Sequence, residues 1–297
     1  MLVSYGSQGV AELEDGRRVQ CIYKRSVGRP YCGDIVELEP ADETQWSVTA
    51  VKERRNEFAR VDRAGRKQII ASNLDRVLIV IAPKPAPSRD LVERYLVAVH
   101  SLGMTPVMVV NKSDLLTEEL LSQDTAFGHL VAYQALGYRV ARVSCTTAAG
   151  LEELMAVVSS GISILVGQSG VGKSSIANKL IPNLELQTGM LSRATGKGTH
   201  TTTTTIMYSI PGSAEVTQGR LVDSPGVWEY GLWEMSADEL SHGFIEFIPY
   251  LGHCRFNDCQ HASEPGCAIR DAVQENQILD WRYQAYRRLL AQSSTGK

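Results

Sequence analysis

The segment 167–175 concentrates side chains suited to one chemistry, the binding of phosphate. It reads G-Q-S-G-V-G-K-S-S and matches the pattern G-x-x-x-x-G-K-[ST]. Glycines let consecutive backbone N–H groups wrap around a phosphate, Lys173 adds a positive charge, and the Ser174 hydroxyl is suited to bind Mg²⁺. The sequence therefore predicts a nucleotide phosphate loop made of Gly167, Gln168, Ser169, Gly170, Val171, Gly172, Lys173, Ser174 and Ser175.

A second segment, N-K-S-D, follows an apolar run at 106–110 and is suited to read a guanine base. The Asp114 carboxylate can accept hydrogen bonds from both N1–H and the 2-amino group of guanine, a pair of donors that adenine lacks. Lys112 is expected to cover the base and Asn111 to brace the loop, with Ser113 between them and Asp114. Alone, the tetrapeptide could be a turn and helix cap, but beside a phosphate loop it favours GTP over ATP.

Two further segments fit the same site. Ser144 and Cys145 begin S-C-T-T-A-A-G, a loop expected to support the guanine O6 through a backbone N–H. Asp223 begins D-S-P-G, where Asp223 would hold Mg²⁺ through a water and the Gly226 N–H would contact the γ-phosphate. Standing alone, D-S-P-G would read as a Pro-Gly turn after an edge strand.

Activation of the attacking water needs a polar side chain. The residue directly after D-S-P-G is Val227, which has no polar group for this task. His200 is the candidate catalytic residue, since an imidazole can position or polarise water near neutral pH; the alternative is a surface histidine in a mobile loop. A hydroxyl of Thr201, Thr202 or Thr203 should also bind Mg²⁺. We assign Thr202, although the sequence does not distinguish the three. Without a glutamine, slow turnover is expected until a partner orders this loop.

A Cys/His cluster near the C-terminus has the composition of a structural zinc site. Cys254, Cys259, His261 and Cys267 follow the spacing C-x₄-C-x-H-x₅-C. Three thiolates and one imidazole complete a tetrahedron with no vacant position, so a structural ion is expected and no chemistry at it. The spacing is not that of a zinc finger, so chance clustering is the alternative. The other three cysteines are scattered, which suggests ordinary buried thiols in a reducing compartment.

The elements that must position these residues follow from the pattern of apolar runs. Short alternating segments separated by turn signals fill the first 67 residues and predict a small β-barrel or sandwich. From residue 74, strand-like runs alternate with helical stretches, which predicts a parallel sheet covered on both faces. The strands expected are 77–82, 107–110, 140–143 and 162–166, with helices at 89–102 and near Thr117 and Leu151. After residue 231 we expect a helix, the Cys/His cluster and a final helix near 274–290.

The motifs occur in a circularly permuted order. In ordinary GTPases the phosphate loop comes first and the base-reading loops last, whereas here the base-reading loops precede it and D-S-P-G follows. With the string G-K-G-T-H-T-T-T at 196–203, D-S-P-G-V at 223–227 and the Cys/His cluster, the chain resembles the bacterial small-subunit-dependent GTPase family RsgA, also called YjeQ. The resemblance covers nearly the whole chain. It implies a multidomain protein with an N-terminal OB-fold β-barrel at 1–70, a central permuted α/β P-loop GTPase domain at 71–230, and a mainly helical zinc-binding domain at 231–297.

The resemblance also implies an activity and partners. The expected function is a GTP-hydrolysing assembly factor that binds the small (30S) ribosomal subunit and its 16S rRNA late in maturation, is stimulated by the subunit and is released after hydrolysis. We expect a monomer. One alternative is an RNA-binding assembly factor in which nucleotide sets conformation and hydrolysis is incidental. Another is a permuted GTPase that serves a different target.

Charge and hydropathy limit how RNA could be bound. The chain has 297 residues and a formal net charge of −3, so any contact with nucleic acid must be local. Two surfaces are candidates: the mostly basic stretch 52–67, and the last helix with Arg282, Arg287 and Arg288 among aromatic residues. Solvated charge and aromatic packing against a neighbouring module is the alternative for each residue.

The N-terminus lacks a basic start followed by an apolar core, and apolar runs are too short to cross a bilayer, so a cytoplasmic protein is expected.

Overall fold

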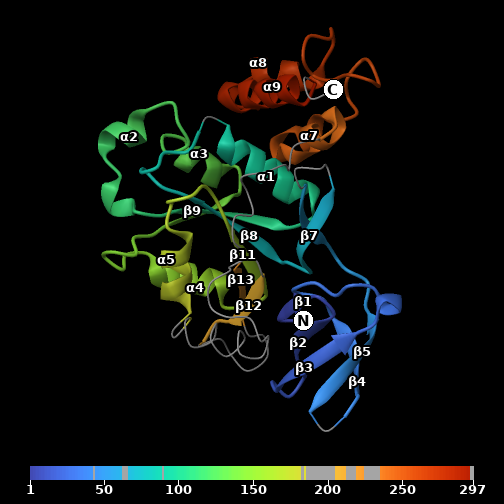
Figure 1. Cartoon of the computed structure of the whole chain (residues 1–297). Helices are drawn as coiled ribbons and strands as arrows, with labels where there is room; N and C mark the ends of the chain where they lie inside the picture. The colour runs from blue at the N-terminus through green and yellow to red at the C-terminus, as the bar shows by residue number, and fades with distance from the viewer. Residues whose placement is uncertain are drawn as a thin grey trace.

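The computed structural model describes residues 1–42, 44–61, 66–88, 90–181, 184, 205–211, 219–223 and 235–294. The predicted residues His200, Thr201, Thr202, Thr203 and Gly226 lie outside these ranges. Within them the chain forms a β-rich N-terminal part, a central α/β part and a helical C-terminal part (Figure 1).

The N-terminal part has the strand order of an OB-fold. Its five strands lie in the order β1-β2-β3-β5-β4, in which β3 and β5 are parallel and the other pairs antiparallel. That arrangement is a five-stranded, partly open Greek-key barrel, as expected from the resemblance. Its elements are β1 Val3–Tyr5, β2 Gln8–Glu12, β3 Arg18–Tyr23, η1 Arg25–Val27, β4 Val36–Pro40 and β5 Gln45–Val51.

The central sheet places its strands in the order β10-β9-β8-β11-β13-β12, all parallel except β12. Residues 77–81 of β8 are 0–1% exposed, because helices cover both faces of the sheet. The predicted parallel sheet is therefore confirmed. Its strands are β8 Arg76–Ile81, β9 Thr105–Val110, β10 Arg139–Arg142, β11 Ile162–Val166, β12 Ile206–Ser209 and β13 Arg220–Asp223.

Helices flank this sheet in two groups. Helix α1 packs on β8 and β9 and α3 on β10, while α4 lies beside α5 on the opposite face (Figure 1). The helix expected at 89–102 begins at Leu91, after Asp90 with its left-handed φ of 65°. The helices are α1 Leu91–Ser101, η2 Ser113–Leu115, α2 Glu118–Ser122, α3 Leu130–Ala135, α4 Leu151–Val158 and α5 Lys173–Leu180.

The N-terminal and central parts share one sheet. Strand β1 pairs antiparallel with β12 through Val3 and Ile206, which makes a continuous eleven-stranded sheet. A separate hairpin, β6 Glu57–Val61 and β7 Lys67–Ser72, lies on the chain between the two parts. The predicted domain boundary at residue 70 thus falls within β7.

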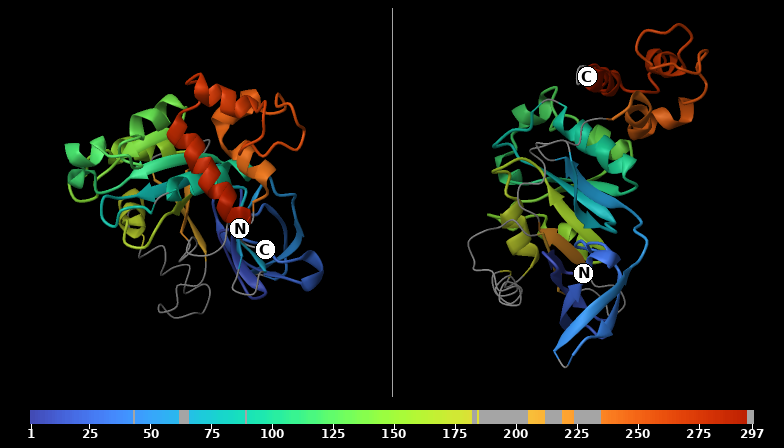
Figure 2. Two further views of the ribbon diagram at one scale, coloured as in Figure 1. Left: turned by 90° about the horizontal axis from the view of Figure 1, so that it is seen from above. Right: turned by 45° about the vertical axis from the view of Figure 1, so that its right-hand side comes forward.

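The C-terminal part consists of helices around a small core of its own. The core includes Leu240, Phe244, Phe247 and Tyr286, and Val97 of α1 belongs to it as well. The final helix, expected at 274–290, is α9 and begins only at Asp280, because Asn276 adopts φ 58° and the chain turns after a preceding short helix that ends at Gln274. Figure 2 shows α9 crossing over the central part. The elements are α7 Ala237–Gly243, η3 Ile245–Tyr250, α8 Ala268–Gln274 and α9 Asp280–Ser294.

Within the described ranges, no helix has both the length and the apolar character needed to span a bilayer.

Candidate nucleotide site and metal centre

The predicted nucleotide-binding loops converge at one edge of the central sheet. Asn111 follows β9, Ser144 lies just after β10, Gly167 follows β11, and Asp223 ends β13. Because these four strands are parallel neighbours or separated only by β8, their carboxyl ends meet at the same edge. The permuted order of the motifs therefore still brings these four loops to one edge of the sheet.

The phosphate loop has the backbone that its glycines allow. Gly167, Gly170 and Gly172 have φ values of 139°, 79° and 96°, which residues with a Cβ rarely adopt. A Cβ on Gly172 would lie 2.3 Å from the Asn111 side-chain nitrogen, and one on Gly167 would lie 2.2 Å from the carbonyl oxygen of Val80. Lys173 begins α5 and donates to the carbonyls of Gly167 (2.6 Å) and Gln168 (2.8 Å). The ammonium group thus already points into the loop that is expected to hold phosphate.

The base-reading loop is bonded directly to the phosphate loop. Asn111 Nδ2 donates to the Val171 carbonyl at 2.8 Å. Lys112 Nζ donates to the carbonyls of Gly170 (2.8 Å) and Lys84 (2.5 Å). Asn111 therefore braces the two loops as predicted, and Lys112 additionally ties in the segment after β8, which the sequence did not reveal.

The loop after β10 is fixed by its own hydrogen bonds. The Ser144 N–H donates to the Ala149 carbonyl at 3.0 Å, and the Ser144 hydroxyl accepts from the Thr147 N–H at 3.2 Å. The Ser113 N–H donates to the Val143 carbonyl at 3.0 Å, which holds this loop beside the N-K-S-D segment. Asp114 is exposed at the start of η2. An exposed carboxylate next to the second loop is open to a base that enters from solvent.

Asp223 lies in an environment matched to a cation. Burial raises the pKa of its carboxyl group, and the positive charge of Lys173 opposes that rise. A bound Mg²⁺ would favour the ionised form in the same way. The Asp223 carboxyl group thus lies where the charge of Lys173, in the phosphate loop, acts on it.

Two buried amide oxygens of this site lack a hydrogen-bond donor in the part of the chain that the structure describes. Within the described residues, the buried Asn111 Oδ1 and Gln168 Oε1 have no hydrogen-bond partner. A buried polar atom without a partner costs about 1–3 kcal/mol, so such atoms usually await a ligand or water. The donor sets and the glycine cradle fit a guanine nucleotide with its magnesium ion. Of the predicted contacts, those of His200, Thr202 and Gly226 lie outside the described residues.

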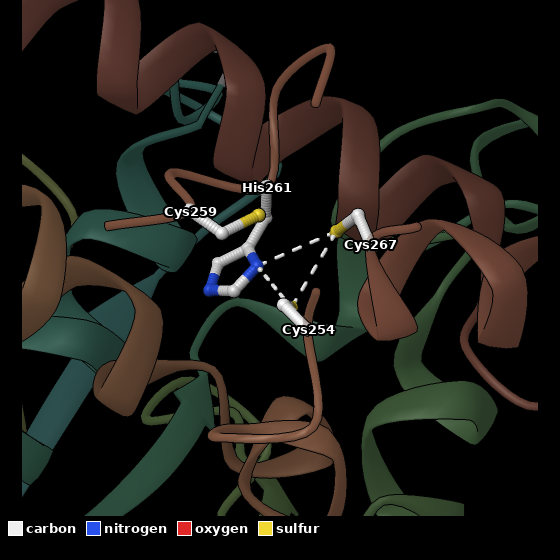
Figure 3. A group of neighbouring side chains, drawn as sticks. All are labelled: Cys254, Cys259, His261 and Cys267. Atoms are coloured by element: carbon white, nitrogen blue, oxygen red, sulfur yellow. Dashed lines mark hydrogen bonds between the residues drawn. The ribbon is translucent and has the colours of Figure 1, made fainter. Parts of the chain in front are cut away.

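The Cys/His cluster is assembled as a candidate metal centre. Figure 3 shows the side chains of Cys254, Cys259, His261 and Cys267 pointing toward one another, and their ligand atoms all lie within 4.8 Å. His261 Nδ1 is 3.5 Å from Cys254 Sγ and 3.4 Å from Cys267 Sγ, and these two sulfurs are 4.0 Å apart. Ligand atoms bound at about 2.1–2.3 Å to a tetrahedral zinc ion are about 3.6–3.8 Å from one another. The separations among Cys254, His261 and Cys267 are therefore close to those of a tetrahedral site, and Cys259 lies within 4.8 Å of them.

Neighbouring residues hold this cluster in shape. Tyr283 of α9 donates to the His261 carbonyl at 2.8 Å, and Tyr286 to the Gln260 carbonyl at 2.7 Å. The Glu264 carboxylate accepts from backbone N–H groups of Gln260, Ala262 and Ser263. Burial lowers the pKa of His261 and so favours the neutral imidazole that a metal requires. Sequence reasoning missed these supports, because tyrosines on a helix carry no signal of their distant acceptors.

The two candidate RNA-facing surfaces differ in how many of their residues are exposed. On α9, Arg282 is 0% exposed and Arg288 binds Asp90 through two hydrogen bonds of 2.8 and 2.6 Å. Arg282 and Arg288 pair with Glu93 and Asp90 of the central part, whereas Tyr283 and Tyr286 are buried in the core of the C-terminal part itself. These four residues are therefore engaged within the protein. Arg287 is exposed.

In the basic stretch, Lys52, Arg66 and Lys67 are exposed, while Arg54 is tied to Asp34 and Glu57. Arg55 pairs with Asp75 and Lys67 with Glu57. The surface thus keeps some exposed cations, but several of its charges are already paired.

A phosphate loop braced by a guanine-reading loop at the carboxyl edge of a parallel sheet, with the motifs in permuted order, defines a circularly permuted P-loop GTPase. The chain belongs to the RsgA GTPase family, whose model matches residues 51–233. GTP hydrolysis is accordingly its activity.

Curated relatives and solved structures agree with this assignment. A protein named small ribosomal subunit biogenesis GTPase RsgA from Chromohalobacter salexigens is 43% identical over 282 residues, covering 94% of this chain and 81% of the relative. Its namesake from Pseudomonas aeruginosa is 39% identical, covering 98% of this chain and 84% of that one. The crystal structure of YjeQ from Thermotoga maritima matches with a TM-score of 0.81 at 28% identity, covering 100% of this chain and 98% of the other. The structure of YloQ, a circularly permuted GTPase, matches in fold with a TM-score of 0.74 at 22% identity over 100% of this chain and 95% of the other.

Proposed function

We propose that this protein is a GTP-hydrolysing assembly factor that binds the small (30S) ribosomal subunit late in its maturation and leaves after hydrolysis. The observation that carries the proposal is the junction between the base-reading and phosphate loops, in which Asn111 and Lys112 bond to Val171 and Gly170. The curated relatives with this family assignment are named as small-subunit biogenesis GTPases, which suggests the same target.

Each part of the nucleotide site has a proposed role. Asp114 reads the guanine, Lys112 covers it, and the backbone after Ser144, including that of Cys145, supports the O6. Residues 167–175 hold the phosphates. Ser174 and Thr202 would bind Mg²⁺ directly and Asp223 would hold it through a water; when bound, the ion would neutralise charge at the transferred phosphate.

His200 is proposed to position the attacking water. Its imidazole can accept a hydrogen bond from water near neutral pH, and Val227 cannot. Intrinsic turnover should be slow, because no glutamine follows Gly226, and small subunits should raise it by ordering this stretch.

The metal in the Cys₃His site is proposed to be zinc, in a structural role. Thiolate and imidazole ligands in a tetrahedron of the observed dimensions favour zinc over magnesium or calcium, which prefer oxygen. With four protein ligands the site has no open position for a water, so the ion is expected to stabilise the loop between η3 and α8.

The division of labour is proposed to follow the three parts of the chain. Residues 1–70 and 231–297 would contact the subunit and its 16S rRNA, and residues 71–230 would bind and hydrolyse GTP. The protein is proposed to act as a monomer in the cytoplasm.

The decisive test is GTP hydrolysis by the purified protein alone and with purified small subunits, with large subunits and ATP as controls. We expect a large rise that requires both GTP and small subunits. Unchanged hydrolysis despite tight GTP binding would reject the small subunit as the activator, and a pull-down with the GTP-bound form would then identify another target.

The rival function is an RNA-binding factor in which nucleotide only sets conformation. The substitution His200→Ala separates the two if GTP binding and small-subunit binding stay intact. Loss of function in cells supports the GTPase cycle, whereas full function supports the rival.

A further inference from the structure

A cavity of about 610 Å³ lies between the central part and α9. Its walls come from the segment around Pro87 and Asp90, the stretch 120–129 before α3, and the first turns of α9. The lining includes none of the residues assigned above to nucleotide or metal. The proposed function leaves this cavity without a role.

One wall of the cavity is aromatic. The rings of His129 and Trp281 stack with centroids 3.9 Å apart and an interplanar angle of 13°. Tyr133 meets Trp281 edge-on at 5.3 Å, and Phe127 completes the lining. Faces of indole and phenol rings attract cations, especially planar guanidinium groups.

The charges that line the cavity leave a negative excess. Asp90 is neutralised by Arg288, and Glu93 binds Arg282 in the buried interface. The Asp124 side chain is 76% exposed and contacts His129 Nε2 at 2.7 Å.

Asp280, the residue before Trp281, is exposed. Its carboxylate accepts a hydrogen bond from the neutral side-chain amide of Gln284, at 3.2 Å from Nε2. Neither Asp124 nor Asp280 forms a salt bridge with an arginine or lysine among the described residues, although the charge of Arg288 also reaches Asp124. These two carboxylates flank the stacked rings.

We propose that this cavity receives an arginine or lysine side chain from a basic segment of a protein partner. The Arg282 guanidinium already lies 5.7 Å from the Trp281 ring centroid and 6.0 Å from that of Tyr133. An incoming guanidinium would therefore lie beside the His129–Trp281 stack and pair with Asp124 or Asp280, which combines two favourable interactions. An RNA strand could also stack a base, but it would bring phosphates against the same carboxylates. The charge therefore favours protein over nucleic acid.

This inference rests on the proposed function only in locating the partner protein on the small ribosomal subunit. A ribosomal subunit offers both RNA and protein surfaces, and the cavity would bind a protein surface. Binding of a short basic peptide does not depend on the subunit, so the two ideas can fail separately.

The test follows the indole N–H signal of Trp281 by NMR, identified by its loss in Trp281→Phe. The probe is the capped tripeptide Gly-Arg-Gly, compared with its neutral citrulline counterpart and with a hexaribonucleotide. We expect a saturable shift with the arginine peptide alone. The double substitution Asp124→Asn, Asp280→Asn should weaken it about tenfold, as the loss of two charge pairs beside a ring predicts.

A matched control is Glu152→Gln, Glu153→Gln, which removes two exposed carboxylates from the first turn of α4. It should leave the titration unchanged, and both double variants should keep unstimulated GTP hydrolysis. The proposal is overturned if the citrulline peptide shifts the signal equally, or if no shift saturates. It is also overturned if the oligonucleotide binds and the Asp124, Asp280 variant binds the arginine peptide as tightly as the wild type does.

A second measurement is binding of the same variants to small subunits. Weaker binding by the Asp124, Asp280 variant alone supports the cavity as a protein contact. If wild-type protein does not bind small subunits at all while the peptide titration succeeds, the proposed function fails and the cavity's preference stands.

Discussion

Gly172 stands at the contact between the two halves of the nucleotide site. Its φ of 96° and its close approach to the Asn111 amide leave no room for a side chain. Asn111 in turn donates to the Val171 carbonyl, so a displacement of Asn111 would disturb both loops. A methyl group at position 172 would therefore press on the side chain that joins the two loops.

The substitution Gly172→Ala should weaken binding of a fluorescent GDP analogue by at least about tenfold, because the Cβ would meet Asn111 Nδ2 at 2.3 Å. The matched control is Gly103→Ala, which has φ 68° but nothing within 4 Å of the added carbon. Gly103→Ala should cost about 1–2 kcal/mol of stability through backbone strain and leave affinity unchanged. Equal affinities for the two variants would contradict the steric account.

A hydroxyl group decides how firmly the Cys/His loop is held. Tyr283→Phe removes the donor to the His261 carbonyl and should cost about 1 kcal/mol while speeding metal release to a chelator. Tyr250→Phe is the control, since its hydroxyl donates to Gln277 outside the cluster. Metal release measured with a chromogenic chelator should separate them, and identical rates would mean that the carbonyl contact does not hold the ligand.

Helix α9 is fastened to the central part by buried charge. Arg282 is 0% exposed and binds Glu93 of α1 and, at 2.5 and 3.1 Å, Glu246 of η3. Burial favours the neutral forms, raising the pKa of Glu246 and lowering that of Arg282, while the ion pairs favour the charged forms. Removal of either the positive or the negative partner would therefore leave an unpaired charge in the buried interface.

Removal of Arg282 should be far more costly than removal of its exposed neighbour. Arg282→Met strands the Glu93 and Glu246 carboxylates and should destabilise the protein by about 3–5 kcal/mol. Arg287→Met lies on the same helix but is exposed and should change stability by less than about 0.5 kcal/mol. Urea denaturation followed by circular dichroism compares them; similar midpoints would show that hydrophobic packing alone holds α9.

Local pattern was sufficient to predict the elements whose signals are local. The strand at 77–82 is apolar throughout, and that at 162–166 is apolar except for Ser163, because both faces are covered. The phosphate loop and N-K-S-D lie at strand ends. The break between α8 and α9 was missed, because Asn276 in a left-handed conformation looks like any polar helix residue. The role of Arg282 was missed because its acceptors lie far away in the sequence.

In the candidate sites too, features with a local sequence signal were predicted and features that depend on distant contacts were not. The four Cys/His residues sit within one loop, so their spacing predicted the cluster. The contact of Lys112 with the Lys84 carbonyl depends on the packing of two separate strand ends, which no spacing encodes. The cavity beside Trp281 arises only when α9 docks on the central part.

Across the whole molecule, the C-terminal part and the GTPase sheet are not independent bodies. Val97 of α1 is buried in the C-terminal core, and Arg288 of α9 holds Asp90 at the start of α1. Tyr283 and Tyr286 of the same α9 bond to the Cys/His loop. A contiguous set of contacts thus runs from the metal centre through α9 to a helix of the GTPase sheet.

Metal removal should therefore loosen α1 as well as the Cys/His loop. We expect hydrogen exchange in Leu91–Ser101 to rise about tenfold or more after treatment with a zinc chelator, because α9 loses the loop against which its tyrosines are bonded. Helix α4, which lies beside α5 on the other face of the sheet, is the internal control and should keep its protection. Unchanged exchange in α1 after complete metal loss would mean that Arg282, Arg288 and the core around Phe244 hold α9 without the ion. In that case the metal would stabilise only its own loop, and the C-terminal part could lose it without any effect on the GTPase sheet.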